Sequence, residues 1–368
     1  MDQLVMLNDS TFYKEKRVLV TGHTGFKGSW LALWLSKMGA EVVGIALDPK
    51  QELDNFNCTK LADKVETVIQ DIRDYDKVGS IFKEFKPEVV FHLAAQALVG
   101  YSYENPRSTF ETNVMGTLNI LESIRHTPSV KSGVMITSDK CYKNIEQVWG
   151  YKETDILGGP DPYSASKGCA ELLIDSYIQS YFHEGFPLIA STRAGNVIGG
   201  GDWSVHRIVP DCFRALFENK AIEIRSPEAT RPWQFVLEPL RAYLMLGEKL
   251  YGGDREFSTS WNFGPNLDRA YNVEEVTREI IKTWGSGELD IRKNADFHEC
   301  GLLQLDCAKA RTFLKWVPLL NFEECIRFTT EWYQHLNQGD NTNKDMYAFG
   351  IKQINEYAKK NELSLEVA

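Results

Sequence analysis

A glycine-spaced segment, Thr21-Gly22-His23-Thr24-Gly25-Phe26-Lys27-Gly28, lies directly between a β-branched run and a helix-like stretch. The run at 17–21 (RVLVT) is typical of a buried strand, and residues 29–38 have helical character. Glycines at this spacing permit a tight turn, let backbone amides approach a pyrophosphate, and let the helix pack closely on the strand. The helix N-terminus then offers free N–H groups and the positive end of its dipole. The segment therefore predicts a dinucleotide-binding turn, with these expected contact residues: Gly22, Thr24, Gly25, Phe26, Lys27 and Gly28.

Short apolar runs alternate with helix-like stretches through the first 200 residues. This alternation predicts βαβ units with parallel strands and right-handed crossovers. Several of the runs show no polar alternation, as expected for strands covered on both faces. We therefore predict an α/β fold with a Rossmann-type, doubly wound parallel sheet. The expected strands are 17–21, 41–47, 65–69, 88–93, 133–137 and 188–193, and the clearest expected helices are 29–38, 108–125 and 164–182.

The pattern changes after a glycine run at 199–201. The segment that follows is rich in proline and mixes helices with loops, although 258–263 reads as one more strand. We predict a dinucleotide-binding domain over 1–200, with a return of 230–265 to it. Residues 201–368 then form mainly a smaller, mixed C-terminal substrate lobe.

Residues at the ends of the expected strands are candidates for further cofactor contacts. Asp48 lies twenty residues beyond Gly28, where a carboxylate hydrogen-bonds the adenosine ribose and repels a 2′-phosphate. Asp48 favours NAD over NADP, while the nearby Lys50 leaves NADP open as an alternative. The other expected contacts follow the third and fourth strands: Asp71, Ile72, Leu93, Ala94 and Ala95.

Tyr163 and Lys167 lie four residues apart where a helix is expected to begin. Side chains at this spacing share one face of a helix. A tyrosine normally titrates near ~10, and a close ammonium lowers that pKa and makes the phenol a usable base. We therefore expect Tyr163 and Lys167 to be catalytic and to contact the cofactor.

The fifth expected strand runs into Ser138, Asp139 and Lys140. In a doubly wound sheet, binding and catalytic sites lie at the carboxyl ends of the strands. Ser138 would offer a hydroxyl to a substrate oxygen beside Tyr163, and Asp139 with Lys140 would supply an acid and a base. These three residues complete the predicted catalytic set.

The motifs described so far resemble the extended short-chain dehydrogenase/reductase family. The resemblance covers most of the chain and rests on TGHTGFKG (21–28), TSDK (137–140), YSASK (163–167), RAGNVIGGGDW (193–203) and RPWQFV (231–236). Within the family, GFKGSWLALWL and TSDKCYKN resemble the 4,6-dehydratases that act on CDP-glucose. Dehydratases that act on dTDP-glucose carry Asp-Glu where this chain has Asp139-Lys140. Related 4-epimerases usually lack this acid/base pair.

The resemblance implies an internal redox cycle on a CDP-glucose-like nucleotide sugar. Tyr163, assisted by Lys167 and Ser138, takes the proton of the 4-hydroxyl while NAD accepts hydride from carbon 4. Water then leaves across carbons 5 and 6, with Asp139 as acid and Lys140, in its neutral form, as base. Hydride returns to carbon 6, and a 4-keto-6-deoxy sugar results.

Substrate contacts are expected from both parts of the chain. The resemblance assigns Arg231 to the diphosphate, and arginine suits bidentate phosphate contacts. It also places Asn196 near the nicotinamide, and Gln96 and Ser138 against the substrate. We interpret Arg193 as structural and Arg207 and Arg214 as surface charges, although both of the latter could reach a phosphate. His298 and Glu299 are weaker candidates for contacts to the base or ribose.

Composition excludes several other classes of function. The net charge of −10 argues against nucleic acid as a partner, and no apolar stretch is long enough for a membrane span. The seven cysteines are scattered without a C-x-x-C pair, so we expect no metal site, no disulfide framework and a reducing cytoplasm. The resemblance also implies a homodimer formed through the helices near 108–125 and 164–182.

Two other functions remain open at the level of sequence. A nucleotide-sugar 4-epimerase would share the glycine turn and the Tyr163/Lys167 pair but would not need Asp139 or Lys140. A non-catalytic NAD-binding sensor would need the turn alone, so the complete set of Ser138, Tyr163 and Lys167 argues against it.

Overall fold

A seven-stranded parallel sheet forms the centre of the protein in the computed structural model, which describes residues 11–266, 269–292, 302–338 and 345–366. The strand order is β11-β6-β5-β4-β1-β2-β3, so the chain starts in the middle of the sheet and winds outward in both directions. The strands are β1 (Arg17–Thr21), β2 (Glu41–Ala46), β3 (Glu66–Ile69), β4 (Val89–His92), β5 (Ser132–Ile136), β6 (Leu188–Ala194) and β11 (Ser260–Phe263). This arrangement confirms the predicted α/β, Rossmann-type fold.

Helices cover both faces of the sheet because the strands carry apolar side chains on both sides. In β1, Val18 and Val20 point into one core and Leu19 into the other. The helices α3 (Tyr75–Phe85), α6 (Gly116–Arg125) and α7 (Pro162–Tyr181) pack on the Leu19 side. The helices α1 (Phe26–Lys37) and α9 (Leu237–Tyr251) pack on the opposite face, with α12 (Met346–Glu366) against α1.

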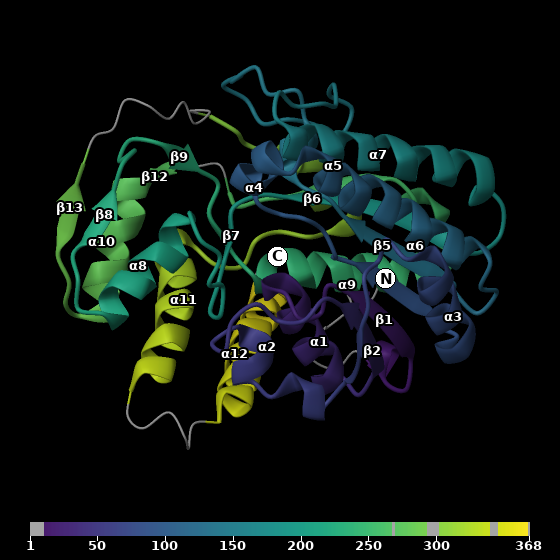
Figure 1. Cartoon of the computed structure of the whole chain (residues 1–368), viewed down its shortest axis with the longest axis horizontal. Coiled ribbons are helices and arrows are strands. Elements are labelled where there is room, and N and C mark those ends of the chain that lie inside the picture. Colours follow the sequence, from purple (N-terminus) through teal and green to yellow (C-terminus); the bar gives the residue numbers. More distant parts are fainter. Residues whose placement is uncertain (1–10, 267–268, 293–301, 339–344, 367–368) are drawn as a thin grey trace.

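A smaller group of elements lies beside the sheet, at the left of Figure 1. It contains α8 (Ile208–Phe217), α10 (Val273–Trp284), α11 (Phe322–Asn337) and three strand pairs, the first of them between β8 (Ile222–Ile224) and β13 (Leu289–Ile291). The other two pairs are β7 (Val197–Ile198) with β10 (Gln234–Phe235), and β9 (Thr230–Arg231) with β12 (Tyr271–Asn272). The short helices α2 (Asn55–Cys58), α4 (Val99–Glu104) and α5 (Pro106–Phe110) follow strands of the main sheet.

The expected strands appear within one or two residues of their predicted bounds. The range 108–125, predicted as a helix, is helical throughout, with a π-helical turn at Glu111–Met115 between α5 and α6. Strand β11 pairs with β6, so a segment beyond residue 200 contributes to the main sheet. The domain division near residue 200 stays a prediction, and His298 and Glu299 lie outside the described residues.

Candidate active site

The glycine turn after β1 is as tight as its spacing predicts. Gly22 has φ +75° and lies so close to the start of the β4 loop that a Cβ atom would stand 2.8 Å from the Ala94 nitrogen. A Cβ on Gly28 would stand 2.0 Å from the Gly22 oxygen. Both positions therefore require glycine, and the turn brings the start of α1 against the ends of β1 and β4.

The residues present at this turn fit the pyrophosphate of a dinucleotide. Gly25 is the N-cap residue of α1, and no side chain caps this helix end, so its first N–H groups are left for another acceptor. Thr24 donates a hydrogen bond to the Leu47 carbonyl at 2.9 Å and ties the turn to the end of β2. Asp48 follows on the exposed part of that segment, where a ribose hydroxyl would reach it.

Lys27 behaves differently from the rest of the turn, because its half-buried side chain extends toward the catalytic residues. Its ammonium lies over the Tyr243 ring of α9, 5.8 Å from the centroid. Burial lowers the pKa of Lys27 to about 7, helped by the charges of Lys167 and Arg207 and opposed by Asp139.

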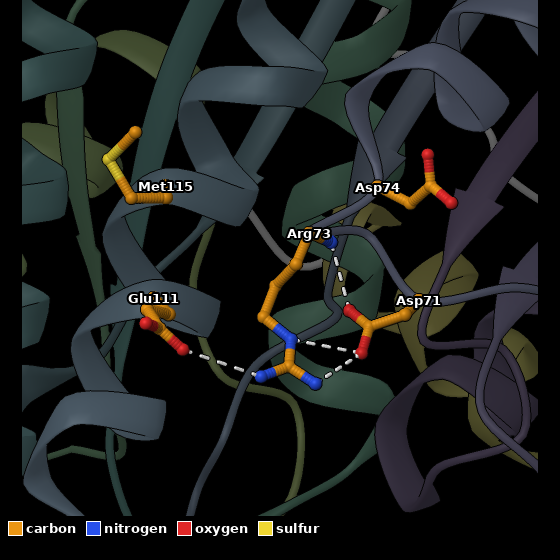
Figure 2. A pocket seen from close by; sticks show the side chains of 5 residues that line it. All are labelled: Asp71, Arg73, Asp74, Glu111 and Met115. Atoms are coloured by element: carbon orange, nitrogen blue, oxygen red, sulfur yellow. Dashed lines mark hydrogen bonds and ion pairs between the residues drawn. The ribbon is translucent and has the colours of Figure 1, made fainter.

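Asp71 and Ile72, the expected adenine contacts, follow β3. Asp71 lines a surface pocket (Figure 2). Asp71 accepts hydrogen bonds from the Arg73 guanidinium at 2.6 and 2.9 Å, which lower the pKa of the carboxyl group. Arg73 also reaches Glu111 at 3.6 Å, as Figure 2 shows. Ile72 is buried against Gly116 of α6. The structure therefore offers a polar edge at Asp71 and keeps Ile72 within the core.

The loop after β4 is held close to the glycine turn. The Leu93 nitrogen donates to the Thr21 carbonyl at 3.1 Å, and the Ala94 nitrogen donates to the Thr21 hydroxyl at 3.1 Å. Leu93, Ala94 and Ala95 are partly exposed here. His92 bridges Thr21 at 2.7 Å and Thr117 at 3.0 Å, and burial lowers its pKa to about 3. A neutral His92 thus joins β1 to α6 beneath the predicted cofactor site.

Gln96 faces its own loop. Its amide nitrogen donates to the Leu98 carbonyl at 3.1 Å and to the Thr109 hydroxyl at 2.9 Å, while its amide oxygen accepts from the Leu98 nitrogen at 2.5 Å. Both ends of the amide therefore brace the loop, and a substrate contact by Gln96 stays a prediction that this geometry does not favour.

Ser138 and Asp139 lie buried immediately beyond β5. The Ser138 hydroxyl donates to Asp139 Oδ1 at 2.9 Å and accepts from the Lys140 nitrogen at 3.2 Å. Asp139 Oδ2 is buried against Gly195 and has no hydrogen-bond partner among the described residues. A buried oxygen without a partner is costly in free energy, which is typical of a site that receives a ligand or a proton. The Lys140 side chain, by contrast, is exposed.

Tyr163 and Lys167 occupy the first turns of α7 and are both buried. Asp161 caps this helix by accepting from the Ser164 nitrogen at 2.9 Å, and Pro162 occupies its first turn. Burial lowers the pKa of Lys167 to about 8, against the opposing effects of Glu171 and Cys141. The structure thus brings Tyr163 and Lys167 together with Ser138 and Asp139 at one edge of the sheet.

The electrostatics of Tyr163 correct one expectation from the sequence. Burial raises its pKa to about 12, and a hydrogen bond with Ser138 only partly opposes this shift. The expectation that Lys167 lowers the pKa of Tyr163 below its ordinary value is therefore wrong for the protein without bound ligands. The phenol therefore needs further positive charge beside it to act as a base near neutral pH.

The structure confirms that Arg193 is structural and reveals a buried partner that the sequence interpretation missed. Arg193 Nη2 lies 2.7 Å from Glu171 on α7, and both side chains are buried. The interpretation of Arg207 as a surface charge is incomplete, because Arg207 lies close enough to lower the pKa values of Tyr163 and Lys27. Arg214 instead binds the Trp203 and Ser204 carbonyls.

A second pocket lies in the smaller lobe and includes Arg231. We call it the lobe pocket, and its other charged and aromatic lining residues are Trp233, Arg269, Tyr271 and Phe322. The Tyr271 and Phe322 rings stack with centroids 3.7 Å apart. Asn196 is outside this lining, in a turn with φ +46° whose carbonyl accepts from the Gln234 nitrogen.

Comparison with known proteins identifies the family. Residues 19–329 match the family described as GDP-mannose 4,6 dehydratase. The chain belongs to this family. It is similar to CDP-glucose 4,6-dehydratase of Salmonella typhimurium, with 46% identity over 358 residues that cover 95% of this chain and 98% of that protein.

Two other similarities place the chain among related enzymes. UDP-glucose 4-epimerase of Mycolicibacterium smegmatis is 30% identical over 333 residues, which cover 88% of this chain and all of that protein (100%). The solved structure of the Thermus thermophilus UDP-glucose 4-epimerase in complex with NAD matches with a TM-score of 0.72 and 27% identity. That match covers 86% of this chain and 99% of the other.

Proposed function

We propose that this protein is a CDP-glucose 4,6-dehydratase that uses NAD and forms CDP-4-keto-6-deoxy-glucose. The observation that carries the proposal is Asp139, a buried carboxylate beside Ser138 whose second oxygen has no described partner. A 4-epimerase has no water to eliminate and so no use for an acid at this position. The choice of cytidine and glucose comes from the Salmonella relative, whose similarity extends over 95% of this chain.

The side chains divide the chemistry between the strand end and the helix. Bound NAD supplies a hydride acceptor for carbon 4, a hydride donor for carbon 6 and a positive charge beside the phenol. Tyr163 removes the proton of the 4-hydroxyl, Ser138 orients that oxygen, and the Lys167 ammonium stabilises the phenolate. The 4-keto group then acidifies the proton on carbon 5.

Asp139 and Lys140 carry out the elimination in this proposal. Asp139 protonates the departing 6-hydroxyl as the bond from carbon 6 to oxygen breaks, and Lys140 takes the proton from carbon 5. Because Lys140 is exposed in the protein alone, its base role requires that the bound sugar cover it. In the lobe, Arg231 binds the diphosphate, and Asn196 contacts the substrate near the nicotinamide.

The cofactor residues form a continuous path along the carboxyl edge of the sheet. The N-terminus of α1 binds the pyrophosphate, Asp48 the ribose, and Asp71 with Ile72 the adenine. Lys50 is exposed near Asp48 and remains the feature that could favour NADP. Comparing the NAD and NADP released from the purified protein by acid tests this assignment, because a majority of NADP would contradict it.

We also infer a homodimer through α5–α6 and α7. Exposed apolar side chains on this surface support it, namely Met115 at 49%, Leu172 at 61% and Tyr181 at 53% exposure. Light scattering at micromolar concentration should give twice the chain mass of 41.9 kDa, and Leu172→Glu should shift it toward the monomer. A monomeric wild type would contradict the dimer.

None of the described helices combines the length and apolar character needed to cross a bilayer. A location in the reducing cytoplasm stays a proposal, supported by a nucleotide-sugar substrate and by the six described cysteines, all of them free.

The test of function is to incubate the pure protein with CDP-glucose and to follow absorbance at alkaline pH, where a 4-keto-6-deoxy sugar has a distinct chromophore. Product without consumption of added NAD supports the dehydratase cycle, and parallel reactions with UDP-glucose and dTDP-glucose measure the base preference. Without product from any of the three, the 4-epimerase becomes the leading function.

A further inference from the structure

Glu171 is a buried carboxylate that has no part in the chemistry proposed above. It lies one helical turn beyond Lys167 on α7, so Tyr163, Lys167 and Glu171 follow one another along one face of the helix. Three side chains donate hydrogen bonds to it: Thr137, Ser191 at 2.7 Å and Arg193 at 2.7 Å. So many charge-assisted bonds on one buried group fix its position tightly.

These bonds connect the two halves of the catalytic set. Thr137 directly precedes Ser138 and Asp139, and its hydroxyl donates to Glu171 Oε1. Ser191 and Arg193 belong to β6, the neighbouring strand. Through one carboxylate, the helix that carries Tyr163 and Lys167 is therefore joined to the strand ends that carry Ser138 and Asp139.

Arg193 extends the connection into the loop that follows Asp139. Its Nη1 donates to the Tyr142 hydroxyl at 2.6 Å, and Tyr142 donates to Asn262 on β11 at 2.8 Å. The guanidinium also lies over the Tyr142 ring, 4.9 Å from its centroid. The Glu171–Arg193 pair is thus the centre of a polar network that spans β5, β6, β11 and α7.

The same carboxylate acts on the charge of Lys167. Titratable groups on several elements act on Lys167 or are affected by its charge: Glu171 on α7, Cys141 beyond β5, Lys27 on α1 and His92 on β4. Asp139 acts on the neighbouring Lys27 and Tyr163. Burial lowers the pKa of Lys167, and Glu171 is the largest influence that opposes this lowering. Removing the Glu171 charge would let Lys167 lose its proton at lower pH.

We propose that Glu171 is a positioning residue for the reaction, which holds the catalytic helix against the strand end that carries Ser138 and Asp139. The inference rests on the proposed function for its catalytic meaning. It predicts an effect on the ionisation of Lys167 that a merely structural ion pair would not have.

The test compares wild type with Glu171→Gln and with Glu171→Asp, which retains the charge. In Glu171→Gln, the alkaline limb of kcat with CDP-glucose should move down by about one pH unit, because a lost opposite charge shifts a pKa by this order. The limb in Glu171→Asp should stay within a few tenths of a unit of wild type. An unchanged limb in an active, folded Glu171→Gln protein overturns the proposal.

A second measurement keeps the inference separate from the proposed function. NMR of protein labelled at lysine Cε follows the titration of Lys167, whose signal is assigned by its loss in Lys167→Met. If wild type dehydrates no sugar, the proposed function fails, and a lower titration midpoint in Glu171→Gln still supports the inference. Equal midpoints in the two proteins overturn it whatever the activity.

A third variant guards against misfolding, because Glu171→Gln leaves the buried Arg193 without its carboxylate. The double variant Glu171→Gln/Arg193→Met removes both charges and tests the same shift in a neutral core. A lower Lys167 midpoint in this protein supports the proposal, and a midpoint equal to that of wild type overturns it.

Discussion

The catalytic edge around β5 and α7 and the lobe pocket around Arg231 are built in different ways. At the catalytic edge, the Ser138 hydroxyl donates a hydrogen bond to Asp139. The Thr137 hydroxyl donates one to Glu171, which lies one helical turn beyond Lys167. The lobe pocket is lined by arginines and rings such as the stacked Tyr271 and Phe322. The first region holds charges in fixed places, whereas the second offers apolar faces and cations to a ligand.

The difference suggests how one fold serves several reactions. Residues at strand ends and on one helix keep their geometry because the sheet itself fixes it, so the oxidation chemistry stays constant. The lobe pocket takes residues from separated segments of the chain, so it can change with little effect on the sheet.

The largest expected effect comes from removing Tyr163, the proposed general base of the catalytic edge. Tyr163→Phe removes the phenol oxygen and should lower kcat by about a thousandfold, the order of a lost acid/base group. Because the ring remains packed, the thermal unfolding temperature should stay near that of wild type. Stopped-flow absorbance of the nicotinamide with CDP-glucose measures the loss directly. Rapid reduction in this variant would contradict the role of Tyr163.

Lys140→Ala separates elimination from oxidation within the same edge. We expect dehydration to slow by about a hundredfold, while the nicotinamide is still reduced by the sugar. Exchange of the proton on carbon 5 with deuterated water should fall in parallel. If dehydration and exchange keep their normal rates, another group is the base, and the half-buried Lys27 near Asp139 becomes the next residue to test.

The sequence predicted the placement of those candidate residues that lie in one segment, while their catalytic and binding roles stay predictions. The glycine turn, Ser138 and Asp139, and Tyr163 with Lys167 each follow from spacing within a single strand end or helix. Glu171 carried a readable signal as well, because 163, 167 and 171 repeat at the spacing of one helical face. A charged residue on the buried face of the catalytic helix could have been selected on that ground.

Other features depend on contacts between distant segments. The Gln96 side-chain amide donates a hydrogen bond to the hydroxyl of Thr109, which belongs to α5. Arg207 reaches the catalytic edge from the start of α8, and the side chain of Lys140, the candidate base, is exposed. The rise in the pKa of Tyr163 likewise reflects burial by the whole fold, which spacing does not describe.

Arg231→Met should change binding in the lobe pocket and leave the catalytic edge intact. We expect KM for CDP-glucose to rise about tenfold, since a lost charged hydrogen bond has roughly this effect, while kcat changes less than threefold. Arg225→Met is a control, because Arg225 is exposed on the lobe and pairs with Glu223. A fall in kcat without a change in KM would show that Arg231 acts on the chemistry instead.

The smallest expected effect concerns the turn that joins β1 to α1. Gly28→Ala forces a Cβ to within 2.0 Å of the Gly22 oxygen, so it should lower the free energy of unfolding by about 1–3 kcal/mol, the usual range for overpacking. Gly79→Ala on α3 is the matched control, because its Cβ meets no atom within 4 Å and alanine favours a helix. Urea unfolding of both variants measures the difference, and acid release of NAD shows whether the distorted turn still retains the cofactor. Equal stabilities would mean that the turn yields to a side chain, and the catalytic edge would then tolerate more change at its cofactor end than its packing suggests.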